Sequence, residues 1–236
     1  MERSTNVNTK VKICGNTNVE DAIMAAEAGA DAIGVINVAN TRRYIDLEDA
    51  KRIFEALPIF ISKVVVITLD NMPIEFVRDK IKLIEETGAD CIQLHGEEPV
   101  ELVADLRESM SMESRIRMIK KIGVGGDKKE CLENALAYEN VVDAILLDTE
   151  AKAGGTGEIG GTGKEHDWNI SKEIVEHVKK PVILAGGLNP ENVAKAIELV
   201  NPYAVDVSSG VESEVRKKDA MKVKKFIEVA RSTNRQ

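Results

Sequence analysis

Aromatic residues are scarce in this chain of 236 residues, at 3%, although 43% of its residues are hydrophobic. A core of this composition has to be built mainly from Ile, Val, Leu and Ala, which suits a parallel sheet covered by helices. The length is compatible with a single domain, because barrels of alternating strands and helices commonly reach about 250 residues.

Cysteine and histidine are also rare, with three of each. Cys14, Cys91 and Cys131 are odd in number and lack C-x-x-C spacing, which argues against a disulfide framework or a zinc site and favours a reducing compartment. The histidines show no metal-ligand spacing either. We therefore expect a cytoplasmic protein that needs no metal and no cofactor.

Long apolar runs and basic blocks are missing as well. No run approaches the roughly 20 apolar residues that span a bilayer. The net charge of -8, with both signs mixed along the chain, disfavours nucleic acid or an anionic membrane as a partner. A small molecule is the expected partner, and both a monomer and a homodimer stay open.

What the sequence does contain is eight short apolar runs rich in branched residues. Segments of helical period separate them, as at Ile74, Val77 and Ile81. The predicted strands are Val11–Cys14, Ala32–Ile36, Lys63–Ile67, Cys91–Leu94, Ile116–Ile122, Ala144–Asp148, Pro181–Ala185 and Ala204–Val207.

Helix signals agree with this alternation. Asn18 and Asp21 form a capping-box pattern, and Asn189, followed by a proline, predicts a helix start. Gly29 and Gly88 each follow a periodic stretch, where a left-handed cap favours glycine.

Eight such units favour a closed (β/α)8 TIM barrel, an α/β fold in one domain, over an open doubly wound sheet. We expect a flexible leader over residues 1–10, the barrel over 11–231 and a flexible tail over 232–236. In such a barrel the active site lies at the carboxyl ends of the strands.

The last two strand ends carry a phosphate-site pattern. Gly186-Gly187 and Ser208-Ser209-Gly210 follow the seventh and eighth strands, where barrels recurrently bind phosphate through backbone N–H groups. The alternative for each loop alone is a tight turn or a helix cap.

Cys14 and Asp148 stand at two other strand ends. Neighbouring cations would lower the pKa of the thiol from about 8.5 and supply a base. Asp148 follows an apolar run, so burial would raise its pKa and make it an acid. The alternatives are a small buried hydrophobe for Cys14 and a helix cap or a lysine partner for Asp148.

Side-chain alternation places further residues in the barrel. If Cys14 and Ser208 point inward, so do Lys12 and Asp206, two residues earlier on neighbouring strands. We therefore predict a buried Lys12–Asp206 ion pair. His95, at the fourth strand end, is a further candidate for the pocket.

A glycine-rich stretch follows Asp148. Residues 155–160 fit G-x-G-x-x-G, but they lie several residues beyond the strand and no apolar helix follows, which disfavours dinucleotide binding. The repeated Gly-Gly-Thr-Gly at 154–157 and 160–163 is better interpreted as a mobile loop over the mouth, with Lys164 near the phosphate.

Taken together, these phrases resemble the phosphoribosylanthranilate isomerase family of tryptophan biosynthesis, collinearly from residue 11 to about 228. The phrases are KICG (12–15), RRY (42–44), QLHGEE (93–98), LLDT (146–149), GGTGK (160–164), HDW (166–168), LAGGLNPENV (184–193) and VDVSSGVE (205–212).

The resemblance implies a cofactor-free Amadori rearrangement of N-(5-phosphoribosyl)anthranilate. By similarity Asp148 is the general acid, Cys14 the general base and Arg43 the group that holds the anthranilate carboxylate. Gly161 joins the two phosphate loops. The chain departs from the family pattern at residues 36–40 and 68–71 and has a longer glycine loop. Another phosphosugar isomerase and a non-catalytic phospho-ligand sensor are the alternative functions.

Overall fold

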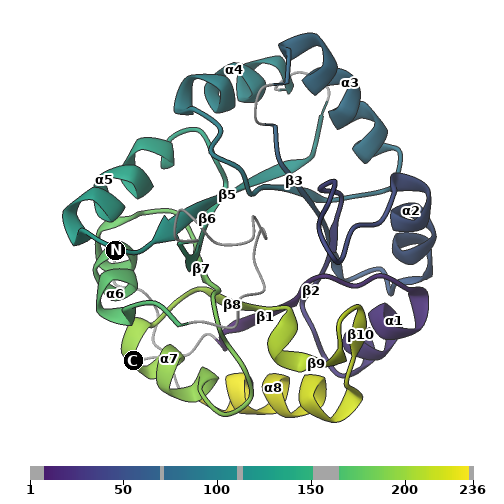
Figure 1. The fold of residues 1–236 in the computed structure, drawn as a ribbon, viewed down its shortest axis with the longest axis vertical. Coiled ribbons are helices and arrows are strands. Elements are labelled where there is room, and N and C mark those ends of the chain that lie inside the picture. The colour runs from purple at the N-terminus through teal and green to yellow at the C-terminus, as the bar shows by residue number, and fades with distance from the viewer. Residues whose placement is uncertain (1–7, 70–71, 111–113, 151–164, 234–236) are drawn as a thin grey trace.

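Eight parallel strands close into a barrel in chain order, with β1 paired to both β2 and β8. The computed structural model describes residues 8–69, 72–110, 114–150 and 165–233. Figure 1 shows the ring of strands with the helices outside it. The strands are β1 (Lys10–Ile13), β2 (Ala32–Ile36), β3 (Ser62–Ile67), β4 (Cys91–Leu94), β5 (Arg117–Val124), β6 (Ala144–Thr149), β7 (Val182–Leu184) and β8 (Ala204–Val207).

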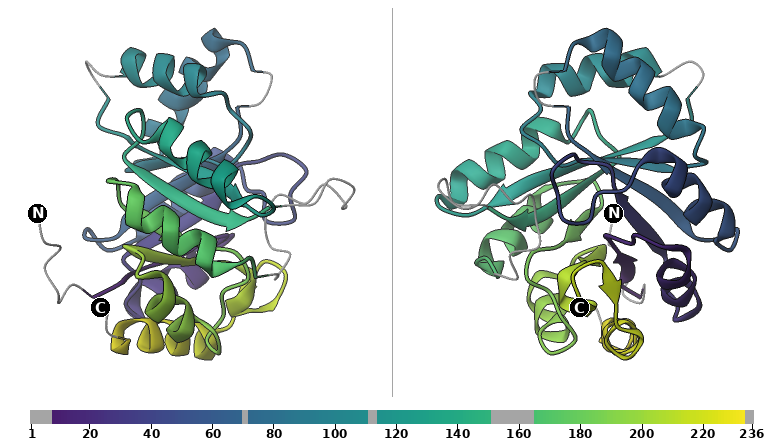
Figure 2. Two further views of the ribbon diagram at one scale, coloured as in Figure 1. Left: turned by 90° about the vertical axis from the view of Figure 1, so that its left-hand side faces the viewer. Right: turned by 45° about the vertical axis from the view of Figure 1, so that its right-hand side comes forward.

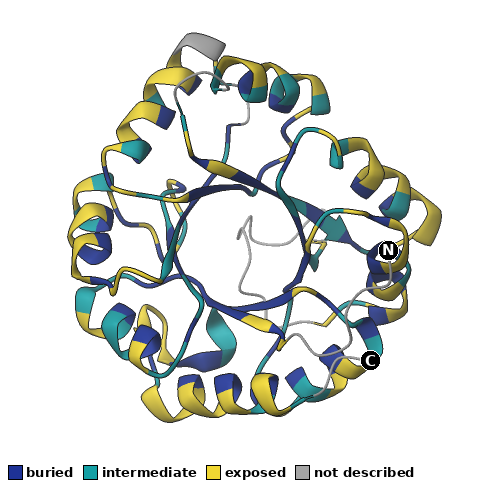
Figure 3. Cartoon of the chain, turned by 180° about the vertical axis from the view of Figure 1, so that it is seen from behind, coloured by how far each residue is buried: buried dark blue, intermediate teal, exposed yellow. Residues whose placement is uncertain are grey.

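A helix follows each strand and covers its outer face (Figures 1 and 2). In Figure 3 the buried residues of the helices face the strands and the exposed ones face away. The helices are α1 (Val19–Glu27), α2 (Leu47–Ala56), α3 (Ile74–Glu85), α4 (Val100–Met110), α5 (Lys128–Tyr138), α6 (Trp168–His177), α7 (Val193–Val200) and α8 (Ala220–Ser232).

The apolar core has two parts. The larger lies between the barrel and the helices and is built almost wholly from aliphatic side chains. The smaller fills the barrel itself with inward side chains from alternate positions of several strands, among them Val64, Ile119, Leu146 and Ile183. This packed interior leaves room for chemistry only at the ends of the strands.

The predicted barrel is confirmed, and so is most of its local detail. Three predicted strands match at both ends, and the other five shift by one or two residues. The side chain of Asn18 accepts from the backbone N–H of Asp21, and Gly29 and Gly88 have positive φ angles of 106° and 79°.

One predicted helix start was wrong. Helix α7 begins at Val193 and not beside Asn189. The side chain of Asn189 instead accepts from the N–H groups of Glu191 and Asn192 and closes a turn before the helix. A proline suits the first position of such a turn as well as that of a helix, so the sequence pattern alone did not separate the two.

Two features lie outside the regular repeat. After β8 come a short 3-10 helix (Ser209–Val211) and an antiparallel hairpin of β9 (Glu212–Glu214) and β10 (Lys217–Lys218). The barrel begins at Lys10 and its last helix runs to Ser232, one residue beyond the predicted bounds at each end. None of the helices in the described part of the chain has the length and hydropathy of a membrane-spanning segment.

Candidate active site

The predicted site residues outside the glycine stretch lie at the carboxyl end of the barrel, because each follows or ends a parallel strand. A small pocket there is lined by Asp148, Asp206 and both predicted phosphate loops. Gly161, Lys164 and the repeated Gly-Gly-Thr-Gly lie outside the described residues.

The glycines of the two phosphate loops are required by close contacts. Gly186 and Gly187 have φ angles of 81° and 67°, and a Cβ on Gly186 would lie 2.7 Å from the backbone nitrogen of Thr149. A Cβ on Gly210 would lie 2.0 Å from the carbonyl oxygen of Leu188. The loops after β7 and β8 are therefore packed directly against each other at one rim.

Ser208 adds an unpaired polar atom to this rim. Its Oγ is buried and has no hydrogen-bond partner among the described residues. Gly15 allows the approach, since a Cβ on Gly15 would lie 2.6 Å from that oxygen. A buried hydroxyl without a partner costs free energy, and an anionic ligand in the pocket would accept its hydrogen bond.

The buried ion pair predicted inside the barrel is confirmed. Lys12 Nζ and Asp206 Oδ1 are 3.0 Å apart, and their side chains are 4% and 9% exposed. The strands place them side by side, because Lys12 and Asp206 are register partners in β1 and β8. Burial by itself lowers the pKa of Lys12, but Asp206 and the thiol of Cys14 outweigh it and the net pKa is raised.

Cys14 follows the last residue of β1, two residues beyond Lys12. Lys12 hydrogen-bonds its thiol, and a Cβ on Gly34 of the neighbouring strand would lie 2.8 Å from its sulfur. Lys12 and Lys218 lower the pKa of the thiol, as predicted. Burial and the carboxylate of Asp206 together outweigh them, so the net pKa of Cys14 is raised.

Asp148 has the environment that the sequence predicted. Its side chain is 17% exposed, and burial raises its pKa from 3.8 to about 6. One carboxylate oxygen, Oδ1, accepts from the backbone N–H of Thr149 at 2.8 Å, which opposes the shift in part. A carboxyl group with this pKa can hold a proton close to neutral pH and release it.

His95 contacts Asp148, one of the residues that line the small pocket. Its Nε2 lies 3.5 Å from Oδ2 of Asp148, and its Nδ1 lies 3.0 Å from the amide nitrogen of Gln93. Burial, with the cations Lys121, Lys12 and Lys120, lowers its pKa to about 3. The imidazole next to the acid is therefore neutral.

Arg43 is held tightly at the opposite side of the mouth. Its Nε and Nη2 donate to the two carboxylate oxygens of Glu212 at 2.7 and 2.6 Å. Lys218, which is fully buried, bonds the same carboxylate at 3.2 Å and the carbonyl of Ser208 at 3.1 Å. The fork of Arg43 is thus fixed beside the Ser208 loop.

Three site residues were given no role by the sequence: Gln93 and Glu212, which stand in the quoted motifs, and Lys218, which lies beyond them. Gln93 could have been predicted, because it lies in β4 two residues before His95, which directly follows the strand, and residues two apart share a face. Glu212 and Lys218 belong to the hairpin after β8, and no periodic pattern predicts which way an irregular loop folds.

His166 links the far end of the glycine stretch to the barrel. Its two ring nitrogens lie 3.2 Å from the hydroxyl of Thr149 and 2.6 Å from that of Ser171. His177 is exposed on α6. The described part of the chain holds no group of three His, Cys, Asp or Glu side chains placed to bind a metal.

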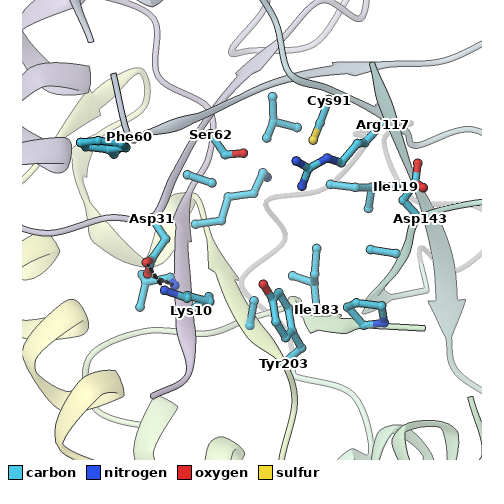
Figure 4. Close-up of a pocket in the computed structure, with 17 residues that line it drawn as sticks. Lys10, Asp31, Phe60, Ser62, Cys91, Arg117, Ile119, Asp143, Ile183 and Tyr203 are labelled. Atoms are coloured by element: carbon cyan, nitrogen blue, oxygen red, sulfur yellow. Dashed lines mark hydrogen bonds and ion pairs between the residues drawn. The ribbon is translucent and has the colours of Figure 1, made fainter. Parts of the chain in front are cut away.

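The amino end of the barrel carries a second hollow, a cavity of about 540 Å³ (Figure 4). Side chains such as Ile119 and Ile183 form its floor, and Lys10 and Asp31 pair at its wall at 2.9 Å. Phe60 stands at its edge, 94% exposed, next to Ile59, which is 87% exposed. This cavity is at the opposite end of the strands from Asp148 and Cys14.

Comparison with known sequences gives one consistent family. A model described as N-(5'phosphoribosyl)anthranilate (PRA) isomerase matches residues 11–229. An N-(5'-phosphoribosyl)anthranilate isomerase of Methanocella arvoryzae is 46% identical over 226 residues, covering 95% of this chain and 99% of the relative. One from Thermotoga maritima is 42% identical over 222 residues, covering 94% and 98%.

Solved structures agree. A phosphoribosyl anthranilate isomerase in complex with reduced 1-(o-carboxyphenylamino)-1-deoxyribulose 5-phosphate has a TM-score of 0.76 and 40% identity, covering 94% of this chain and 98% of its own. A second structure, with the same TM-score and coverage and 39% identity, is of monomers generated from the dimeric enzyme of Thermotoga maritima.

Proposed function

Because the chain belongs to the N-(5'-phosphoribosyl)anthranilate isomerase family, we propose that Asp148 and Cys14 are the acid and the base of its reaction. The enzyme converts N-(5'-phosphoribosyl)anthranilate to 1-(2-carboxyphenylamino)-1-deoxyribulose 5-phosphate in tryptophan biosynthesis. The observation that carries the assignment of the acid is the buried carboxyl of Asp148, with its pKa raised to about 6.

The reaction is an internal transfer of hydrogen in two stages. Asp148 gives its proton to the ribose ring oxygen; the bond from C1 to that oxygen breaks, and the nitrogen lone pair forms a Schiff base. The thiolate of Cys14 then takes the proton from C2, which yields an enol that tautomerises to the ketone. No external oxidant or cofactor is required, because C1 is reduced as C2 is oxidised.

The loops after β7 and β8 bind the phosphate in this proposal. The tight glycine contacts of Gly186 and Gly210 and the unpartnered hydroxyl of Ser208 support it, and Gly187 and Ser209 complete the loops. Gly161 is retained as a further phosphate contact from the family pattern alone. Binding there fixes the phosphate end of the substrate beside Asp148.

Arg43 is proposed to bind the anthranilate carboxylate. Glu212 holds its guanidinium in one orientation before substrate arrives, so little side-chain entropy is lost on binding. A guanidinium that already pairs with one carboxylate can still present its outer edge to a second.

The protonation states required of the two groups oppose their resting states. Asp148 must carry its proton although its pKa is about 6, and Cys14 must lose one although burial raises the pKa of its thiol. The reactive form is therefore a minor population near neutral pH. We expect kcat/KM to rise through pH 6 and to fall only where the thiol titrates.

A fluorescence assay for the loss of phosphoribosylanthranilate tests the function. Wild type should turn over, and Asp148→Ala and Cys14→Ala should each lose at least about 100-fold in kcat. Wild-type activity no higher than that of both variants would overturn the assignment and favour a phospho-ligand sensor. Turnover of a different phosphosugar alone would indicate another isomerase on the same fold.

We also propose that the enzyme is a homodimer joined through the amino ends of its barrels. Ile59 and Phe60 are adjacent, apolar and almost fully exposed beside the cavity of Figure 4, and a two-fold axis would let each copy insert this pair into the other's cavity. The monomers in the structure with 39% identity were generated from a dimeric enzyme.

Light scattering measures this assembly directly. Phe60→Ser should shift the mass of the particle from dimer to monomer, whereas Phe76→Ser, an exposed phenylalanine on α3, should leave it unchanged. A wild-type monomer at micromolar concentration would contradict the proposal.

The cytoplasm is the proposed location of the protein, since the three cysteines are free and buried.

A further inference from the structure

Gln93, in β4, and His95, directly after the strand, form a chain of contacts that leads to Asp148. The amide nitrogen of Gln93 lies 3.0 Å from Nδ1 of His95, and Nε2 of His95 lies 3.5 Å from Oδ2 of Asp148. Gln93 is 1% exposed, so its amide has little freedom to turn. The other oxygen of Asp148 is already held by a backbone N–H, which fixes the carboxyl plane.

The contact with Gln93 sets the tautomer of the imidazole. An amide nitrogen can only donate, so Nδ1 of His95 has to accept. In a neutral ring the single proton then stands on Nε2, the nitrogen that faces Asp148. His95 therefore presents an N–H donor, without a charge, to the carboxyl group that acts as the acid.

The neutrality of His95 is as important as its tautomer. An imidazolium at 3.5 Å would favour the ionised form of Asp148 and lower the pKa that makes it an acid. Burial comes first among the causes that keep His95 neutral, and the cations of Lys121, Lys12 and Lys120 add to it. His95 is thus a hydrogen-bond donor without a positive charge, so it does not add the pKa-lowering effect of a cation to Asp148.

We propose that His95 is a positioning residue that stabilises the carboxylate of Asp148 as it forms, and that Gln93 sets the tautomer this requires. The separation of 3.5 Å is long for a hydrogen bond, so the contact is weak in the resting site. Once Asp148 has given up its proton, the same contact becomes charge-assisted and tightens. An interaction that strengthens on the way to the transition state lowers the barrier.

The proposal rests on the proposed role of Asp148 as the acid. The other groups that act on this carboxyl are the N–H of Thr149, the carboxylate of Asp206 and the ammonium groups of Lys121 and Lys12. None of them is altered when His95 is substituted, so a change in the titration of Asp148 reports on His95 itself.

His95→Ala and His95→Gln form a matched pair, because glutamine keeps an N–H donor and alanine does not. In His95→Ala we expect kcat to fall about 10- to 100-fold with KM changed less than about threefold. The acidic limb of kcat/KM should move upward by about one pH unit, since the carboxylate has lost a donor. His95→Gln should restore most of kcat and return the limb toward that of wild type.

Two results would overturn the proposal: an unmoved acidic limb in His95→Ala, or a His95→Gln enzyme as slow as His95→Ala. Nitrogen-15 NMR of the wild-type histidines gives an answer that needs no variant, because His95 should be protonated on Nε2 and not on Nδ1 from pH 5 to 9. The opposite tautomer would contradict the role of Gln93. Failure of wild-type turnover would count against the proposed function, and the two failures are thus distinguishable.

Discussion

The mouth of the barrel has two halves with opposite electrostatic design. In the cationic half, made of Lys12, Arg43 and Lys218 with the carboxylates of Asp206 and Glu212, every charge has a buried counter-charge. In the neutral half, Asp148 faces an uncharged imidazole and its pKa rises to about 6. The base lies in the first half and the acid in the second.

The difference shows how one cavity runs both kinds of proton transfer. Burial disfavours the charged form of either group, so it opposes the thiolate and supports the protonated carboxyl. Lys12 offsets part of this penalty for Cys14, whereas no ammonium group is within bonding distance of Asp148 among the described residues. The positions of the cations therefore distinguish the base, Cys14, from the acid, Asp148.

The largest expected effect is on stability, in the cationic half. Lys12→Met leaves Asp206 buried without its partner and should lower the free energy of unfolding by about 3–5 kcal/mol. Urea denaturation measures this loss, with Lys51→Met on the exposed face of α2 as the control. A second substitution, Asp206→Leu, should recover part of it; equal stability of Lys12→Met and wild type would show that the pair is not coupled.

In the neutral half, removing a buried charge should increase the stability of the fold instead of lowering it. The carboxyl of Asp148 has a higher pKa in the folded chain than in the unfolded one, so its protonated form stabilises the fold below about pH 4. That contribution is lost as pH rises through 6. A shift of about two pH units amounts to about 3 kcal/mol.

Asp148→Asn should therefore be more stable than wild type at pH 8 by up to about 3 kcal/mol, and the gain should vanish at pH 4. Thermal unfolding at the two pH values checks it. A gain of equal size at both would mean that ionisation of Asp148 is not the cause.

A smaller effect is expected on binding. Glu212→Gln removes the charge that fixes Arg43 and should raise KM about tenfold, or about 1.4 kcal/mol, with little change in kcat. Steady-state kinetics gives the two constants separately. Glu214→Gln, exposed in the same hairpin, is the control, and a loss confined to kcat would place Glu212 in the chemical step instead.

The smallest effect concerns Lys121, an ammonium group of β5 that acts on the acid from a distance. Lys121 lowers the pKa of Asp148, and its side chain pairs with the exposed Glu97 at 2.9 Å. Lys121→Met should move the acidic limb of kcat/KM upward by less than about one pH unit. The exposed Lys129→Met should leave the limb in place, and a downward shift for Lys121→Met would contradict the electrostatic comparison of the halves.

The alternation of inward and outward side chains along a strand explains which site residues could be predicted from the sequence. It placed Lys12 beside Asp206 correctly, because inward residues repeat every second position and parallel strands meet in register. The same rule also reaches Gln93 and His95. It does not reach Glu212 or Lys218, whose backbone has no repeating period, so only their folded positions show that they pair with Arg43.

Periodicity predicted the barrel and the strand ends that carry its chemistry, and the apolar residues before Asp148 predicted the raised pKa of its carboxyl. The pKa of Cys14 depended instead on the folded chain, because burial acts on the thiol together with the nearby Lys12 and with Asp206 and Lys218 from the far end of the sequence. Such a balance depends on distances in space, and spacing along the chain does not contain them.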